Sequence, residues 1–151
     1  MIMLIMLAGP EAIRLVEAGV GDRIQWRGFV QDIGTAFQEM DVLLVPSLQE
    51  SWCRVAAEGM AAGLPVVGTD IPGMAELFRR VPGALTFPVD RPQVGAEHLR
   101  LLLKDPSLRR SLGEAGRDAM RAFDAGAVAR QLLDLYDQLL TRSVPGPTAV
   151  G

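Results

Sequence analysis

The stretch SLQESWCRVAAEGMAAGLPVVGTDIPGMAE, from Ser47 to Glu76, decides how the rest of the chain is interpreted. It carries two carboxylates, Glu50 and Glu58, on either side of a predicted helix start. The helix is expected to end at Gly63-Leu64-Pro65, because glycine and proline favour helix termination. A second apolar strand follows and leads into a loop that contains Gly73. We expect this segment to lie at the edge of a cleft, held there by the rest of the chain.

Apolar runs and helical patterns alternate on both sides of this stretch. A continuous apolar run indicates a strand that is covered on both faces, and apolar residues at helical spacing indicate a helix. The expected strands are 2–7, 24–29, 42–45, the apolar run after Pro65, and 84–87. The expected helices begin near Pro10, after Asp32 as N-cap and near 51–53, and then cover about 74–80, 93–104, 107–123 and 125–142. This alternation predicts an α/β fold with a mostly parallel, doubly wound sheet and a helical C-terminal segment.

The two ends of the sequence carry separate expectations. The opening run MIMLIMLAG has no basic leader and is too short to span a bilayer, so we interpret it as a buried strand. The last helix has an apolar stripe that includes Leu132, Leu135 and Leu139. The tail SVPGPTAVG is rich in proline and glycine, and we expect residues 143–151 to be disordered.

The composition is that of a folded protein. The chain has 151 residues, 49% hydrophobic and 22% charged, which suits one domain and argues against disorder. A net charge of −3 with scattered basic residues disfavours a nucleic-acid binder, which usually shows a basic patch. The single cysteine, Cys53, cannot form an internal disulfide and fits a reducing compartment. The sequence contains no cluster of cysteine and histidine that would predict zinc.

The carboxyl ends of the strands are the expected ligand site, because ligands of open parallel sheets bind at that edge. The helix start after Glu50 offers free backbone N–H groups and the positive end of the helix dipole, which suit a phosphate. Arg54 adds positive charge, and the carboxylates would accept hydrogen bonds from hydroxyl pairs of a sugar or ribose. Together these groups favour a nucleotide-sugar. The loops expected along this rim are 8–10, 28–31, 46–53 and 69–73.

These residues resemble the donor-binding segment of the family 4, GT-B type, retaining glycosyltransferases. Glu50 and Glu58, with seven residues between them, then GLPVVGTD, Gly73 and Glu76, are similar to that family's signature. LAGPE at 7–11, DRIQWRGFVQD at 22–32 and the stretch 101–117 resemble its GxGPE turn, its third-strand segment and its LLxDPxLRxxLGxAGR helix pair. The resemblance covers about residues 2–140. It implies a Rossmann-like donor-binding domain over 1–142, the C-terminal half of a GT-B fold.

The resemblance implies a role for each matching position. Glu50 would contact the transferred sugar nearest its reacting carbon, which makes it the candidate catalytic residue, and Glu58 would hold the ribose hydroxyls. The helix start would contact the diphosphate, and a separate loop would bracket the base. Members of the family need no metal and no further cofactor, because basic side chains and the helix dipole neutralise the leaving diphosphate. The helix-start residues are Ser51, Trp52, Cys53 and Arg54, and the base-bracketing residues are Gly28, Phe29 and Val30.

The chain departs from the family pattern in two ways. Ser51-Trp52-Cys53 stands where Gly-Phe-Gly or Pro-Phe-Gly is usual, so a Cβ is added where backbone must approach a phosphate. Gly59 replaces the usual alanine after the second glutamate, at a cost of ~1 kcal/mol in helix propensity. The resemblance also implies that the acceptor-binding N-terminal domain and the first strand and helix of the donor domain are missing. With the usual strand order, 2–7 and 42–45 should then flank an unfilled position or pair directly.

Simpler interpretations compete with several assignments. Glu50 and Glu58, taken singly, would be a solvated loop residue and a surface charge on a helix. A reactive Cys53 would have a lowered thiol pKa at the helix start, a minor alternative. His98, the only histidine, is interpreted as a surface residue. Glu76 would either stabilise its loop or touch ligand, and the sequence favours neither.

The sequence therefore predicts a retaining glycosyltransferase for hexosyl transfer from a nucleotide-sugar, present as a partial chain that holds the donor-binding half. The alternative is a non-catalytic remnant or accessory domain of the same fold, and a sugar-nucleotide epimerase is a weaker one. The expected partners are the donor and a separate chain that supplies the acceptor domain, with no nucleic acid and no transmembrane segment. The expected location is cytoplasmic, with peripheral contact to the inner membrane through the missing N-terminal domain as an option.

Overall fold

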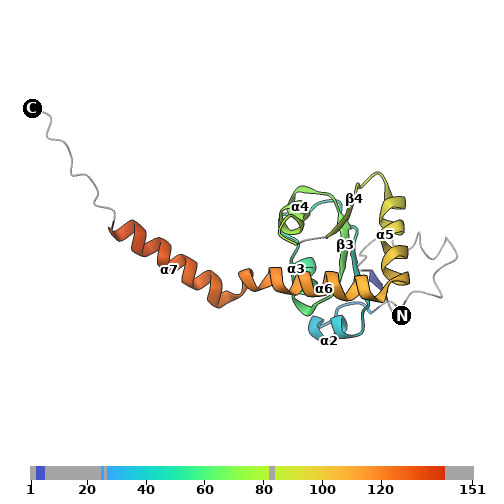
Figure 1. The fold of residues 1–151 in the computed structure, drawn as a ribbon, viewed down its shortest axis with the longest axis horizontal. Helices are drawn as coiled ribbons and strands as arrows, with labels where there is room; N and C mark the ends of the chain where they lie inside the picture. The colour runs from blue at the N-terminus through green and yellow to red at the C-terminus, as the bar shows by residue number, and fades with distance from the viewer. Residues whose placement is uncertain (1–2, 6–24, 26, 82–83, 142–151) are drawn as a thin grey trace, which may run out of the picture.

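Four parallel strands form the sheet of the computed structural model, which describes residues 3–5, 25, 27–81 and 84–141. The strand order is β1-β2-β3-β4, and each strand pairs in parallel with the next. Helices cover both faces of the sheet, so the prediction of an α/β, doubly wound parallel fold is confirmed (Figure 1). The strands are β1 (Met3–Ile5), β2 (Val42–Val45), β3 (Val66–Thr69) and β4 (Leu85–Phe87).

The helices begin where the sequence provides caps. Asp32 accepts hydrogen bonds from the backbone N–H groups of the first turn of α2, and Asp105 does the same for α6. Hydrogen bonds from Thr35 and Ser107 lower the pKa of these two carboxyl groups, as expected for N-caps. The helices are α2 (Ile33–Gln38), α3 (Arg54–Ala62), α4 (Pro72–Phe78), α5 (Pro92–Lys104), α6 (Pro106–Met120), the 3-10 turn η2 (Arg121–Phe123) and α7 (Ala125–Thr141).

Two hydrophobic layers sandwich the central strands, because successive strand side chains point to opposite faces. Leu43 of β2 joins side chains of α2, α3 and α4 in the larger layer. Val42 and Val67 face the smaller layer, where they pack with Leu102 of α5. All three strand residues and Leu102 are fully buried. The alternation fixes the register of β2 and β3, because a one-residue slip would exchange the two layers.

The contact between α3 and α6 depends on small residues. Gly63 ends α3 in a left-handed conformation with φ of 88°, which favours glycine. A Cβ on Gly113 of α6 would overlap the carbonyl oxygen of Gly63. Arg117 completes the contact, because its guanidinium donates to the carbonyl oxygen of Ala62 at 2.9 Å. The two helices therefore approach too closely for larger residues at this point.

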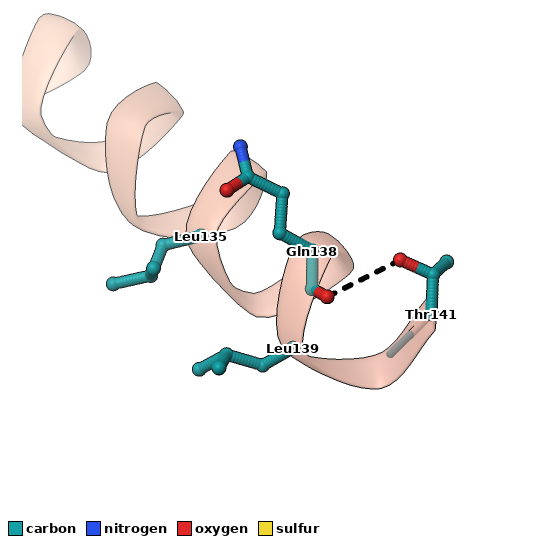
Figure 2. Close-up of a pocket in the computed structure, with 4 residues that line it drawn as sticks. All are labelled: Leu135, Gln138, Leu139 and Thr141. Carbon is teal, nitrogen blue, oxygen red and sulfur yellow. Dashed lines mark hydrogen bonds between the residues drawn. The ribbon is translucent and has the colours of Figure 1, made fainter. Parts of the chain in front are cut away.

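Helix α7 projects away from the sheet (Figure 1), and none of its residues is buried. Its leucine side chains are exposed among the described residues, with exposed fractions of 48% for Leu132 and 82% for Leu140. Leu135 and Leu139 project from the same side of the helix, where with Gln138 and Thr141 they line a shallow hollow (Figure 2). None of the described helices is long and apolar enough to cross a membrane.

One expected strand is not found where it can be checked. Gln25 and 27–29 lie in irregular backbone and are exposed, with Phe29 at 93%, so this part of the predicted strand 24–29 is wrong. The segment buries too few side chains on the described sheet, and Arg27 instead pairs with Glu39 after α2. Three expectations fall on residues that the structure does not describe. They are the helix near Pro10, the Pro82-Gly83 turn and the tail 143–151.

Smaller corrections concern helix ends. Helix α4 begins at Pro72, two residues before its expected start, because proline suits the first helical turn. The helix expected over 107–123 changes to a 3-10 turn at Arg121. Strands β1 and β2 pair directly, from Met3 opposite Val42 to Ile5 opposite Leu44, which confirms one of the two expected arrangements.

Replacing Gly113 by alanine tests the α3–α6 contact. Alanine is the better helix former by about 0.5–1 kcal/mol, yet we expect Gly113→Ala to lower the free energy of unfolding by about 1–3 kcal/mol through overpacking. Urea denaturation measures the change. Gly126→Ala is the matched control, because its new Cβ would meet only side-chain atoms. A stabilised Gly113→Ala variant would contradict the close approach.

Candidate functional site

Two loops form the candidate site at the carboxyl ends of β2 and β3. One loop runs from Pro46 to Cys53 between β2 and α3, and the other joins β3 to α4. Because β2 and β3 are paired neighbours, both loops leave the sheet at the same edge. This confirms that two of the four expected rim segments, 46–53 and 69–73, lie side by side.

The Glu50 side chain is held by the hydroxyl group of Ser47, and Ser47 is held in turn by the hydroxyl group of Thr69. Ser47 donates a hydrogen bond from Oγ to Glu50 Oε1 at 2.9 Å. Thr69, the last residue of β3, donates from Oγ1 to the backbone carbonyl oxygen of Ser47. Thr69 is 2% exposed and is the only buried polar side chain among the described residues. The Glu50 carboxylate is therefore connected to the sheet rather than free in solvent.

Gly73 lets the second loop approach Glu50. It lies in the first turn of α4, where it is buried, instead of in the expected loop. A Cβ at this position would overlap the backbone carbonyl oxygen of Glu50 and crowd the carbonyl carbon of Ser51. The backbone of α4 thus packs directly against the backbone of the Glu50 loop. Only glycine leaves enough space for this contact.

Cys53 is the N-cap of α3, and its side chain points into the core. Its φ of −80° is ordinary for any residue, and its exposed fraction is 1%, so the added Cβ strains no backbone. Burial raises the pKa of the Cys53 thiol, and the negative charge of Glu50 raises it further. The alternative of a reactive thiol with a lowered pKa is therefore wrong. The cysteine that departs from the family pattern is a core residue.

Arg54 and Glu58 form an ion pair on the first two turns of α3. Arg54 Nη2 lies 3.1 Å from Glu58 Oε1, and both side chains are solvent-accessible. Such an exposed pair between residues four apart is weak. The side chain of Cys53, the N-cap residue, makes no capping hydrogen bond, although the N–H group of Arg54 donates to the carbonyl oxygen of Trp52 at 3.0 Å. A ligand could therefore separate Arg54 from Glu58 at little cost.

Trp52 anchors the middle of the Glu50 loop. Its ring lies 5.3 Å from that of Phe123 in η2, at an interplanar angle of 46°. The guanidinium of Arg80 lies 5.4 Å from the centroid of the Phe123 ring. Both aromatic rings are partly buried against the larger hydrophobic layer. Trp52 therefore acts here through packing, which the sequence did not reveal because Phe123 is distant along the chain.

The three residues predicted to bracket the base differ in backbone conformation and in exposure to solvent. Gly28 has a φ of 59°, a left-handed conformation that glycine adopts without strain. Phe29 is almost fully exposed, whereas Val30 packs against the same hydrophobic layer as Trp52. Phe29 is thus available to a ligand, and Val30 fixes the end of its loop.

Two other candidate residues have structural contacts. Nε2 of the half-buried His98 lies 3.0 Å from the backbone carbonyl oxygen of Thr86 in β4, so the interpretation of His98 as a surface residue needs correction. Glu76 of α4 is exposed and pairs with Arg79 and Arg80, which follow the helix. Among the described residues, no group of three or more His, Cys, Asp or Glu side chains could hold a metal ion.

The sequence interpretation assigned no role to Ser47, Thr69 or Gly73. Their signal was present: a polar residue ending a buried strand, a hydroxyl three residues before a glutamate, and a glycine before a helix. Phe123 had no signal of this kind. Only the packing of η2 on the loop identifies its contact with Trp52.

The family follows from a sequence comparison. Residues 3–105 match the sequence model described as Glycosyl transferases group 1, which covers the sheet, both loops and α5. The chain belongs to the group 1 glycosyl transferases. This confirms the resemblance drawn from Glu50, Glu58 and the residues after them.

Individual relatives agree with this membership. The phosphatidyl-myo-inositol mannosyltransferase of Mycobacterium leprae is 31% identical over 87% of this chain and 36% of its own length. The D-inositol 3-phosphate glycosyltransferase of Xylanimonas cellulosilytica is 36% identical over 88% of this chain and 34% of its own. The solved sucrose-phosphate synthase of Thermosynechococcus elongatus is similar with a TM-score of 0.73 and 28% identity, covering 91% of this chain and 38% of that one. The chain thus spans about a third of the length of these relatives.

The buried thiol of Cys53 gives a prediction for pH. Below the ordinary thiol pKa of 9.0 both folded and unfolded forms are neutral, but above it the unfolded thiol ionises first. We therefore expect the stability of the native protein relative to Cys53→Ala to fall as pH rises above 9.0. Urea denaturation at a series of pH values measures this difference.

Thiol labelling supplies the control, since Cys53 is the only cysteine. Labelling should be slow in buffer and fast in denaturant. Fast labelling of the native protein at neutral pH would contradict the burial of the thiol.

Proposed function

We propose that this chain is the donor-binding part of a retaining glycosyltransferase that transfers a hexosyl group from a nucleotide-sugar. The observation that carries the proposal is the pair of carboxylates, Glu50 and Glu58, on either side of the α3 start. Membership of the group 1 glycosyl transferases supports the reaction class. The related mannosyltransferase and glycosyltransferases support a sugar as the transferred group.

Each part of the site would meet one part of the donor. Glu58 would accept hydrogen bonds from the two ribose hydroxyls, since a carboxylate has two oxygens for such a pair. The diphosphate would lie at the start of α3, where the helix dipole and Arg54 neutralise negative charge. Glu50 would hold the sugar, and the exposed ring of Phe29 would stack on the base. Ser51, Trp52 and Cys53 contribute the backbone of the phosphate contact.

Donor binding would change the ion pair on α3. Arg54 leaves Glu58 for the diphosphate, and Glu58 then turns both oxygens to the ribose. The exposed pair holds these side chains close to their working positions in the free protein. Stabilising the leaving diphosphate in this way requires no metal and no further cofactor, so we propose transfer that is independent of both.

Glu58→Ala tests the ribose contact. We expect isothermal calorimetry to detect binding of UDP, GDP or ADP at up to millimolar concentration, and Glu58→Ala to weaken it about tenfold or more. Binding of inorganic pyrophosphate should not weaken, because Arg54 is freed from its partner. EDTA should leave all affinities unchanged.

Asp118→Ala is the matched control, because Asp118 is an exposed carboxylate of α6 that pairs with Arg121 three residues away. If no nucleotide binds to the native chain at millimolar concentration, the proposal is wrong. Tighter nucleotide binding by Glu58→Ala would show that Glu58 only restrains Arg54.

The acceptor-binding half is proposed to come from a separate chain or segment that covers the apolar face of α7. The matched part of the relatives is only about a third of their own length. Leu132, Leu135 and Leu139 form an exposed stripe, and Asp134 and Asp137 lie outside it, so the occupant should be apolar rather than charged. A cytoplasmic location, where the single buried thiol stays reduced, and peripheral contact of this partner with the inner membrane belong to the same proposal.

Co-expression tests the partner surface. The part of the Xylanimonas cellulosilytica relative that this chain does not match is expected to co-purify with it and to be lost with Leu135→Asp plus Leu139→Asp. Asp134→Ala on the polar side of α7 is the control. If the chain alone forms a dimer that the double variant dissociates, a second copy covers α7 and the partner proposal fails.

A further inference from the structure

Two hydroxyl groups connect the buried end of β3 to the carboxylate proposed to hold the sugar. Thr69 Oγ1 lies 2.5 Å from the carbonyl oxygen of Ser47, and Ser47 Oγ lies 2.9 Å from Glu50 Oε1. The first contact joins residues 22 positions apart and so links the end of β3 to the loop after β2. The second contact spans three residues within one loop.

The strand fixes the start of this chain of contacts. Thr69 pairs with Phe87 of β4, while its neighbour Gly68 pairs with Val45 of β2, so its backbone is held on both sides. A β-branched side chain has few rotamers, and its burial leaves the hydroxyl proton no water to bind. The single proton of Thr69 is therefore committed to the carbonyl oxygen of Ser47.

The hydroxyl group of Ser47, like that of Thr69, can donate only one hydrogen bond. Its hydroxyl has one proton, which it donates to Oε1 of Glu50. Oε2 of Glu50 then remains for a ligand, with the plane of the carboxylate set by its partner. Gly73 adds a backbone limit, because α4 lies directly against the Glu50 carbonyl group. Main chain and side chain of Glu50 are thus restrained by different neighbours.

We infer that Ser47 is a positioning residue for Glu50 and that Thr69 positions Ser47. The inference rests on the proposed function, in which Glu50 holds the transferred sugar. It assigns sugar recognition to a set of three side chains, Thr69, Ser47 and Glu50, and leaves nucleotide recognition to Glu58 and the start of α3. A hydrogen bond that only closed the loop would affect both recognitions alike.

Calorimetry with paired ligands separates these two roles. Each pair consists of a nucleoside diphosphate and its sugar form: UDP with UDP-glucose, or GDP with GDP-mannose. The pair is chosen by which of the two diphosphates binds the native chain. For Ser47→Ala we expect the nucleotide-sugar affinity to fall about fivefold to tenfold, with the diphosphate affinity changed less than about twofold. Ser47→Thr keeps a hydroxyl and should restore most of the loss. Ser111→Ala, an exposed serine of α6, is the control.

Coupling to Glu50 is the second readout. If Ser47 acts through Glu50, the double variant Ser47→Ala plus Glu50→Gln should lose no more sugar affinity than Glu50→Gln alone. Thr69→Val should act in the same direction as Ser47→Ala, while Thr69→Ser should resemble the native protein. Thermal unfolding by circular dichroism confirms that each variant is folded before it is titrated.

The outcomes distinguish this inference from the proposed function. Equal loss of both ligands in Ser47→Ala, or no loss of either, overturns the positioning role while the donor site stands. Additive losses in the double variant also overturn it. Failure of the native chain to bind either ligand overturns the proposed function and the inference with it.

Discussion

The parallel pairing of β2 with β3 is the constraint on which the rest of the structure depends. Both strands are buried between two hydrophobic layers, so neither can shift by one residue without exchanging the layers. The pairing brings the ends of two strands, and the loops after them, to one edge of the sheet. Ser47 and Thr69 come into contact for this reason, although they are 22 positions apart in the sequence.

Small residues extend this constraint from the sheet to the helices. Gly73 allows α4 to touch the Glu50 loop, and Gly113 allows α6 to touch the end of α3. Helix α3, which carries Arg54 and Glu58, is thus restrained by α4 at the loop before it and by α6 at its C-terminal end. A site for a flexible, charged ligand benefits from such a frame, because little ordering remains to be done when the ligand binds.

The unusual loop Ser51-Trp52-Cys53 is accommodated by the core rather than by the ligand site. The side chain of Cys53 is buried in the core, and Trp52 packs on Phe123, which also contacts Arg80. The extra Cβ at Cys53 therefore lies in the hydrophobic core, and the departure from the family pattern is accommodated by packing.

The sequence by itself determined the α/β class, the bounds of β2 and β4 almost to the residue, the N-cap Asp32 and the helix end at Gly63. These features are local, because they follow from apolar runs, helical spacing and the backbone freedom of glycine. The predicted strand at 24–29 failed in its described part, since periodicity cannot tell whether a sheet offers a partner edge. Only the tertiary structure decided that Cys53 is buried with a raised pKa, that Phe123 supports Trp52, and that Thr69 reaches Glu50 through Ser47. These contacts join residues far apart in the chain, and their existence depends on packing distances that no sequence pattern encodes.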